Sequence, residues 1–145
     1  MIGTMVMSKY FLLGCILFSL VACSKEEEKF QLFSAESFAY SMDNGWELNA
    51  TVRAKGFVQK ENGSKFSIKL SYYLNLQTPD GKLINNIYSG VIDKTENEKI
   101  YEIPIESQIK LDSTYKQGNY KIIFYVKDEL SGKEISTESI FELSN

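Results

Sequence analysis

Apolar and polar residues alternate with a period of two along most of the chain after residue 30. Residues 46–55 are the clearest case: one parity is polar, and the other carries Trp46, Leu48, Ala50, Val52 and Ala54. Such alternation is typical of a β-strand with one buried face and one solvated face. The pattern recurs at 66–76, 100–105, 120–127 and 135–143, and we expect strands there.

The same parity predicts which side chains face inward. In the second run these are Phe66, Ile68, Leu70, Tyr72, Leu74 and Leu76. In the third run they are Tyr101, Ile103 and Ile105. Pro104 lies between them and predicts an edge strand, because proline cannot donate a hydrogen bond to a neighbouring strand.

Turn residues separate these runs. Asp43-Asn44-Gly45 and Asn62-Gly63 contain residues that tolerate positive φ, and Pro79-Asp80-Gly81 is also a turn sequence. We expect one or two short strands in 30–42, two short strands in 83–92 with a turn near Asn85-Asn86, and a loop in 93–99. No stretch after residue 30 has the period of a helix, so the pattern predicts an all-β sandwich.

The first 22 residues have a different character. Lys9 is their only charged residue, and residues 10–22 are uncharged and mostly apolar. That run is shorter than the roughly 20 apolar residues that a membrane-spanning helix needs. A positive start, an apolar centre and small residues at the end are typical of a signal peptide.

The leader ends in Leu20-Val21-Ala22-Cys23, which resembles the lipobox of bacterial lipoproteins. The resemblance implies that the Cys23 thiol carries diacylglycerol, with fatty acids such as palmitate, and that cleavage precedes Cys23. The chain then divides into a signal peptide (1–22), a lipidated Cys with a polar tether (23–29) and a folded domain (30–145). A single-span anchor, or a leader with a chance cysteine, is the alternative.

The tether also bears on location. The residue after Cys23 is Ser24. An Asp at this position would resemble an inner-membrane retention signal, so its absence favours sorting to the outer membrane. Lys25-Glu26-Glu27 resembles a tag that exports some lipoproteins to the cell surface. We therefore expect a lipid-anchored protein of the bacterial outer membrane, facing the periplasm or the cell surface. A solvated linker without sorting meaning is the alternative.

Composition excludes several functions. Loss of 1–22 removes Lys9 and no acidic residue, so the net charge of −3 becomes −4, which argues against a nucleic-acid binder. The chain has no histidine, and its two cysteines are Cys15 and Cys23. A Ser–His–Asp or Cys–His nucleophile and a His or Cys zinc site therefore cannot be built in the domain. We expect no enzyme, no cofactor and no metal.

Gly118-Asn119-Tyr120 resembles the Gly-x-Tyr that begins the penultimate strand of immunoglobulin-like and fibronectin type III-like domains. The resemblance implies an antiparallel immunoglobulin-like sandwich of about seven strands. It also implies that Tyr120 is a corner residue whose hydroxyl bonds upstream backbone. Ile122 would stand where antibody domains have a disulfide cysteine, with apolar packing in its place.

That fold would put the strand of 66–76 beside that of 120–127, which pairs with 135–143. Four residues would then form an outward apolar patch, called here the candidate face: Tyr73, Ile123, Tyr125 and Ile140. Such a patch can mark an interaction site. Plain sheet stabilisation, or cover by residues 30–33, is the alternative.

Paired carboxylates occur as Glu102 with Glu106 and as Asp128 with Glu129. A glycosidase would hold two carboxylates across a cleft, but a solvated strand face and a loop explain these pairs better. Turn chemistry explains the Asp-Gly turns better than calcium binding does. We therefore expect a non-enzymatic binding or structural module of the cell envelope that contacts a protein or glycan. A small-ligand or inhibitor lipoprotein that uses loops at one end of the sandwich is the alternative.

Overall fold

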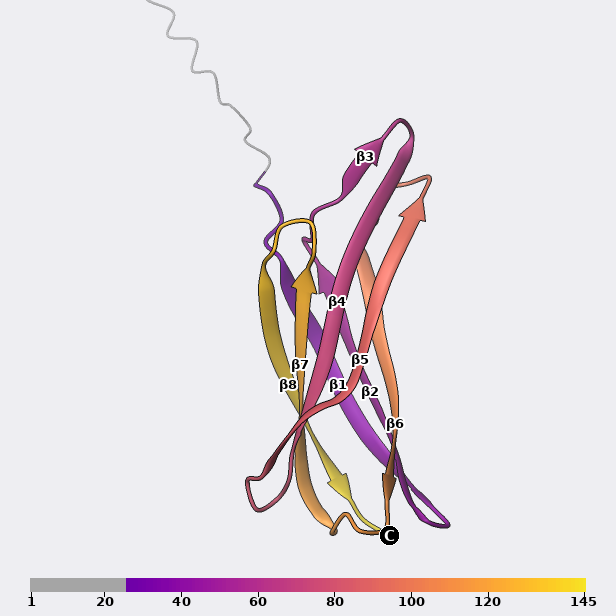
Figure 1. Ribbon diagram of the computed structural model, residues 1–145, viewed down its shortest axis with the longest axis vertical. Coiled ribbons are helices and arrows are strands. Elements are labelled where there is room, and N and C mark those ends of the chain that lie inside the picture. The colour runs from indigo at the N-terminus through magenta and orange to yellow at the C-terminus, as the bar shows by residue number, and fades with distance from the viewer. Residues whose placement is uncertain (1–25) are drawn as a thin grey trace, which may run out of the picture.

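A computed structural model describes residues 26–145, and these form eight antiparallel strands (Figure 1). The strands are β1 (Gln31–Met42), β2 (Gly45–Lys55), β3 (Lys60–Asn62), β4 (Lys65–Gln77), β5 (Leu83–Glu96), β6 (Glu102–Asp112), β7 (Gly118–Asp128) and β8 (Glu134–Leu143). In this part of the chain, no helix is long and apolar enough to cross a membrane. The lipobox, the leader and Cys23 lie outside the described residues.

Two sheets pack face to face. The first, sheet A, has the order β1-β2-β6, and the second, sheet B, has β3-β4-β7-β8 with β5 on the other side of β4. In Figure 1, β4, β5, β7 and β8 lie in front of β1, β2 and β6. The predicted antiparallel sandwich is confirmed, with eight strands instead of about seven. The additional strand is β3, which forms a short hairpin with the start of β4.

Alternation buries one face of each sheet, as the sequence pattern predicts. On β2, Leu48, Ala50, Val52 and Ala54 are fully buried and Trp46 is 8% exposed. They meet the inward side chains of β4 and β7, among them the fully buried Leu70, Leu74, Ile122 and Phe124. Apolar packing between the sheets is thus the main stabilising term of the domain.

The prediction for residues 83–99 was wrong in two respects. Residues 83–96 form one long strand, β5, with an irregularity where Asn86 has a φ of 51°. The polar residues 93–96 continue this strand because they pair with β4, and the hydroxyls of Ser67 and Thr95 lie 2.8 Å apart. β5 is an edge strand, and an edge strand accommodates polar side chains on both faces.

The prediction that Tyr101 faces inward was also wrong. Tyr101 is 70% exposed and precedes β6, while Ile103 and Ile105 are buried as expected. The regular alternation begins only when pairing with β2 begins, at Glu102 opposite Lys55. The edge position predicted from Pro104 is confirmed, because β6 lies at one end of sheet A.

Asp128 has a role that its loop-like sequence context did not indicate. It ends β7, is only 1% exposed, and accepts hydrogen bonds from the backbone N–H groups of Val58 (2.9 Å) and Leu130 (3.0 Å). A buried carboxylate needs such donors. Asp128 is therefore a structural residue that joins the segment after β2 to the β7–β8 turn.

Tyr120 begins the inward row of β7 and is 2% exposed. Its hydroxyl donates to the carbonyl oxygen of Lys116 at 2.6 Å, and its ring lies 5.6 Å from that of Phe141. Burial raises the pKa of Tyr120 above its usual value, so the hydroxyl keeps its proton at neutral pH. This is the geometry that a corner tyrosine requires.

Tyr120→Phe is expected to lower the free energy of unfolding by about 1 kcal/mol, because the hydrogen bond from the buried Tyr120 to the carbonyl oxygen of Lys116 is lost. Urea denaturation followed by fluorescence measures the change. Tyr101→Phe is the matched control, because its hydroxyl belongs to a 70% exposed side chain. Equal stability of Tyr120→Phe and the wild type would contradict a structural role for this hydrogen bond.

Candidate interaction face

The outer face of sheet B brings two residues of the candidate face into direct contact. Tyr73 on β4 and Tyr125 on β7 are register partners, and their rings stack with centroids 4.7 Å apart and planes inclined by 5°. Parallel aromatic rings at this distance stabilise a pair of strands. The stack lies half-buried on the outside of the sandwich.

Ile123 lies one outward position along β7 from Tyr125, and its register partner on β8 is Glu138. Ile140 lies further along β8, opposite Lys121, and is 66% exposed. Lys121, the partner of Ile140, forms an ion pair of 3.1 Å with Glu138, the partner of Ile123. This ion pair crosses the space between the two isoleucines. Ile140 is therefore at the margin of the candidate face, and the two tyrosines with Ile123 form its centre.

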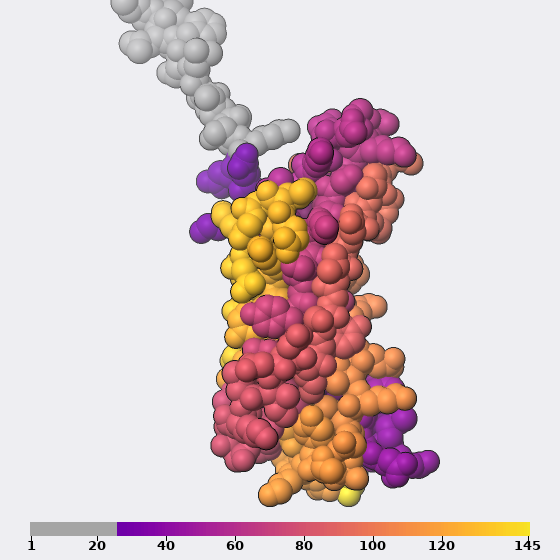
Figure 2. All heavy atoms as spheres, viewed as in Figure 1, coloured from indigo at the N-terminus to yellow at the C-terminus, as the bar shows by residue number. Residues whose placement is uncertain are grey.

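The N-terminal segment does not cover this face. Residues 31–33 start β1 and pair with 53–55 of β2, in the opposite sheet. β1 also contacts the edge of sheet B, where the Ser37 hydroxyl donates to Ser139 at 2.7 Å. Figure 2 views the molecule from the side of β4, β5, β7 and β8, and these strands form much of the visible surface. Among residues 26–145, the outer face of sheet B is uncovered.

A hollow of about 480 Å³ adjoins the stacked tyrosines at the outer edge of β4 and β5. It is called here the β5 hollow, and its lining residues are Ser71, Tyr72, Tyr73, Asn86, Ser89, Gly90 and Val91. Burial raises the pKa of Tyr72, and nearby Tyr88 adds to the effect. Desolvation likewise raises the pKa of Tyr73, with contributions from Glu134 and Tyr125. Both phenols are therefore neutral at physiological pH.

The β5 hollow was not predicted from the sequence. Its end wall depends on the irregularity at Asn86, whose backbone N–H donates to the side-chain oxygen of Asn75 at 2.8 Å. Asn75 has outward parity, yet it is only 6% exposed, and it lies at the irregularity in the pairing of β4 with β5. The pair Asn85-Asn86 indicated a turn, but the direction of the bend depends on the contact with β4.

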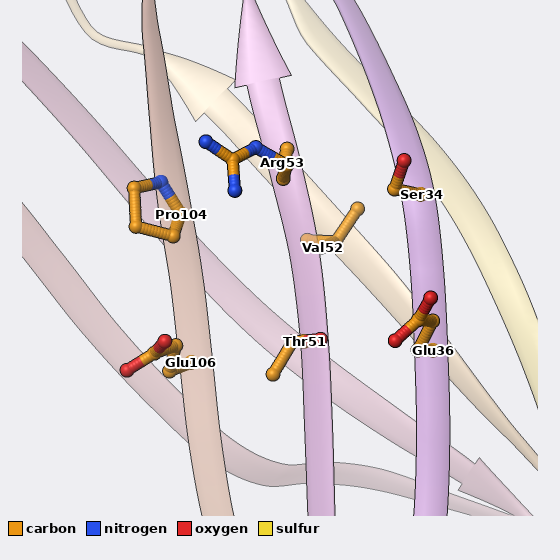
Figure 3. A pocket seen from close by; sticks show the side chains of 7 residues that line it. All are labelled: Ser34, Glu36, Thr51, Val52, Arg53, Pro104 and Glu106. Carbon is orange, nitrogen blue, oxygen red and sulfur yellow. The ribbon is translucent and has the colours of Figure 1, made fainter.

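A second hollow, of about 310 Å³, lies on the outer face of sheet A (Figure 3). Glu36 of β1, Thr51 of β2 and Glu106 of β6 lie in one row across the three strands. Arg53 points toward β6 in Figure 3 and forms an ion pair with Glu102. Glu102 and Glu106 thus belong to a solvated strand face. Glu102 is paired with Arg53, and Glu106 lines the shallow hollow.

The described residues contain no group of three or more His, Cys, Asp or Glu side chains that could hold a metal ion. The sequence reading also missed an exposed row on β1, formed by Phe38, Tyr40 and Met42. Phe38 and Tyr40 make an edge-to-face contact at 5.1 Å. Their shared parity within 31–42 was visible in the sequence, but the strand's orientation was not.

No family model matches this chain, and no curated protein matches it. Among solved structures, a family 123 glycoside hydrolase from Clostridium perfringens, studied for glycolipid glycan hydrolysis, is similar with a TM-score of 0.48 and 17% identity. The similarity covers 74% of this chain and 22% of that protein, so this chain spans about a fifth of its length. A likeness of this size carries no argument about function.

Proposed function

We propose that this chain is a lipid-anchored, non-enzymatic binding module of a bacterial cell envelope. Cys23 would hold it at the outer membrane, and the candidate face would contact a protein or glycan partner. The observation that carries the proposal is the stacked pair of Tyr73 and Tyr125 beside a hollow on a sheet that no other described strand covers. Tyrosine is enriched at interfaces because it combines a large rigid apolar surface with a polar tip.

The start of the folded domain supports the anchoring part of the proposal. Glu28 forms an ion pair of 3.2 Å with Lys55, and the carbonyl oxygen of Lys29 packs so closely on Gly56 that a Cβ there would lie 2.2 Å from it. Only residues 24–27 therefore separate Cys23 from residues that contact the domain. At about 3.5 Å per residue, the five steps from Cys23 to Glu28 span at most about 17 Å.

This short tether would also orient the candidate face. Residues 26–30 and the β3–β4 hairpin lie at the same end of the sandwich (Figure 1). Tyr73 follows Lys65, the first residue of β4, by eight positions along the strand. At about 3.3 Å per residue, the tyrosine stack would stand roughly 26 Å from the tethered end, clear of the lipid headgroups.

Non-enzymatic function is supported by the absence of histidine from the sequence and of cysteine after Cys23. The two hollows described above lie on sheet faces. These observations favour contact through a sheet face over the alternative of ligand binding by loops at one end of the sandwich.

Affinity capture of the lipidated chain from its native envelope tests the proposal. We expect the wild type to capture a partner. The double variant Tyr73→Ala/Tyr125→Ala should capture about tenfold less of this partner, because the central aromatic contacts of an interface dominate its affinity. Tyr101→Ala is the matched control, since Tyr101 is exposed and outside the candidate face.

A different surface would be indicated if Tyr40→Ala on sheet A removed the partner while the double variant retained it. That result, or equal capture by all variants, would contradict the proposed face. A thermal melt of each variant confirms that a lost partner is not the result of unfolding.

A further inference from the structure

The lining of the β5 hollow is uncharged. Its seven residues are two tyrosines, two serines, an asparagine, a glycine and a valine, although 24% of the chain is charged. The phenols of Tyr72 and Tyr73 are also neutral at physiological pH. A neutral lining disfavours an anionic or cationic ligand, because no opposite charge within the hollow would replace the water that the ligand loses.

Tyr73 offers one side of its ring to the hollow. The other side is stacked on Tyr125 of β7, while β5, on the opposite side of β4, carries Ser89 as the register partner of Tyr73. The stack and the half-burial of Tyr73 restrict its ring, so little rotational freedom is lost when a ligand packs on it. An aromatic wall therefore faces a strand that presents an exposed hydroxyl.

The other groups of the hollow are hydroxyls and an amide. Ser71 lines the hollow and donates its hydroxyl to the carboxylate of Glu129, which orients the serine oxygen. Ser89 is exposed on the edge strand, and the amide of Asn86 supplies both donors and an acceptor. Hydroxyls and amides of this kind form adaptable hydrogen bonds to neutral polar ligands.

We propose that the β5 hollow binds a neutral saccharide, with a sugar ring packed on Tyr73 and its hydroxyls bonded to Ser71, Ser89 and Asn86. A pyranose has an apolar C–H face and a rim of uncharged hydroxyls, which matches an aromatic wall beside neutral donors and acceptors. The volume of about 480 Å³ lies within the range of small-molecule sites. This inference rests on the proposed binding function and names the ligand class for part of it.

Calorimetric titration of the full lipidated chain, in a detergent without a sugar headgroup, tests the inference. The neutral probes are maltohexaose, cellohexaose and chitohexaose, and hexagalacturonate is the acidic comparison. We expect at least one neutral probe to bind and the acidic probe not to bind. Tyr73→Ala should weaken binding about tenfold or more, while Tyr101→Ala should leave it unchanged.

Ser89→Gln provides a second variant, because Ser89 is exposed on an edge strand and the longer side chain would fill the hollow without entering the core. It should weaken the same probe at unchanged thermal stability. The inference is overturned if none of the neutral probes binds at millimolar concentration. It is also overturned if binding survives both Tyr73→Ala and Ser89→Gln.

The outcome separates this inference from the proposed function. If no saccharide binds while envelope capture still depends on Tyr73 and Tyr125, the partner is a protein, and only the saccharide inference fails. If saccharide binding is absent and capture is unaffected by the double variant, both fail. If a neutral saccharide binds the wild type and Tyr101→Ala but not Tyr73→Ala, and capture depends on Tyr73 and Tyr125, both stand.

Discussion

Replacing Cys23 with alanine is expected to abolish incorporation of radiolabelled palmitate and to release the protein from the membrane fraction. The lipobox-like sequence implies that the Cys23 thiol is the attachment point of the diacylglycerol. Each buried acyl CH₂ contributes roughly 0.8 kcal/mol, and two or more chains give stable anchoring. Loss of the thiol would remove this whole contribution, so the expected effect is complete rather than partial.

Cys15→Ala is the matched control, because it removes the only other cysteine of the chain and lies within the leader. It should leave labelling and membrane fractionation unchanged. Palmitate labelling that persists in Cys23→Ala would show that the lipid is attached elsewhere, and it would remove the basis for the tether length calculated above.

Phe124→Ala is expected to lower the free energy of unfolding of the domain by about 3–5 kcal/mol. Phe124 is fully buried at the centre of β7 and is the largest of the fully buried side chains among residues 26–145. Its removal would lose transfer free energy and leave a cavity between the sheets. Because residues 24–145 contain no cysteine, no disulfide limits the unfolded state. A loss of this size is a large fraction of the 5–15 kcal/mol that stabilises a typical protein.

Phe38→Ala removes the same side chain from a position that is 46% exposed on the outer face of β1. It should cost less than about 1 kcal/mol, since surface substitutions have small effects. Guanidinium denaturation of the two variants and the wild type measures the difference. Similar losses for Phe38 and Phe124 would contradict a core located between the two sheets.

Much of the fold could be predicted from the sequence because the sandwich has one buried face per sheet. The alternation from Trp46 to Ala54 can satisfy only one orientation of β2, since a shift by one residue would expose every apolar side chain. The positions of β4, β7 and β8 followed from the same reasoning. Tyr120 was identified by the resemblance of Gly118-Asn119-Tyr120 to the Gly-x-Tyr of immunoglobulin-like domains.

Where the prediction failed, the determining contacts come from distant parts of the chain. Residues 93–96 look like a loop in isolation, and they extend β5 because β4 offers a partner from Phe66 onward. The burial of Asp128 depends on donors from Val58, which lies 70 residues away. The alternation of apolar and polar residues shows which face of a strand a side chain occupies. It does not show which strands pair with each other or in which register.

The candidate face was predicted from the sequence in part. The resemblance to immunoglobulin-like domains predicted that Tyr73, Ile123 and Tyr125 share one outer surface, and the pairing of β4 with β7 brings the three residues together. The ring stack required the register of β4 against β7, which pairs Tyr73 with Tyr125 directly. Ile140 has the predicted parity, but an ion pair crosses the space between it and Ile123. The β5 hollow required the bend at Asn86, which no periodicity encodes.

Photocrosslinking in the native envelope would show whether a partner binds through the outer face of sheet B. A benzophenone amino acid placed at position 123 of the full lipidated chain would stand beside the tyrosine stack. The same residue at position 108, on the outer face of β6, is the control for sheet A. A discrete adduct at position 123 and none at position 108 is the predicted result. Adducts at position 108 alone, or none at position 123, would contradict partner binding through the outer face of sheet B.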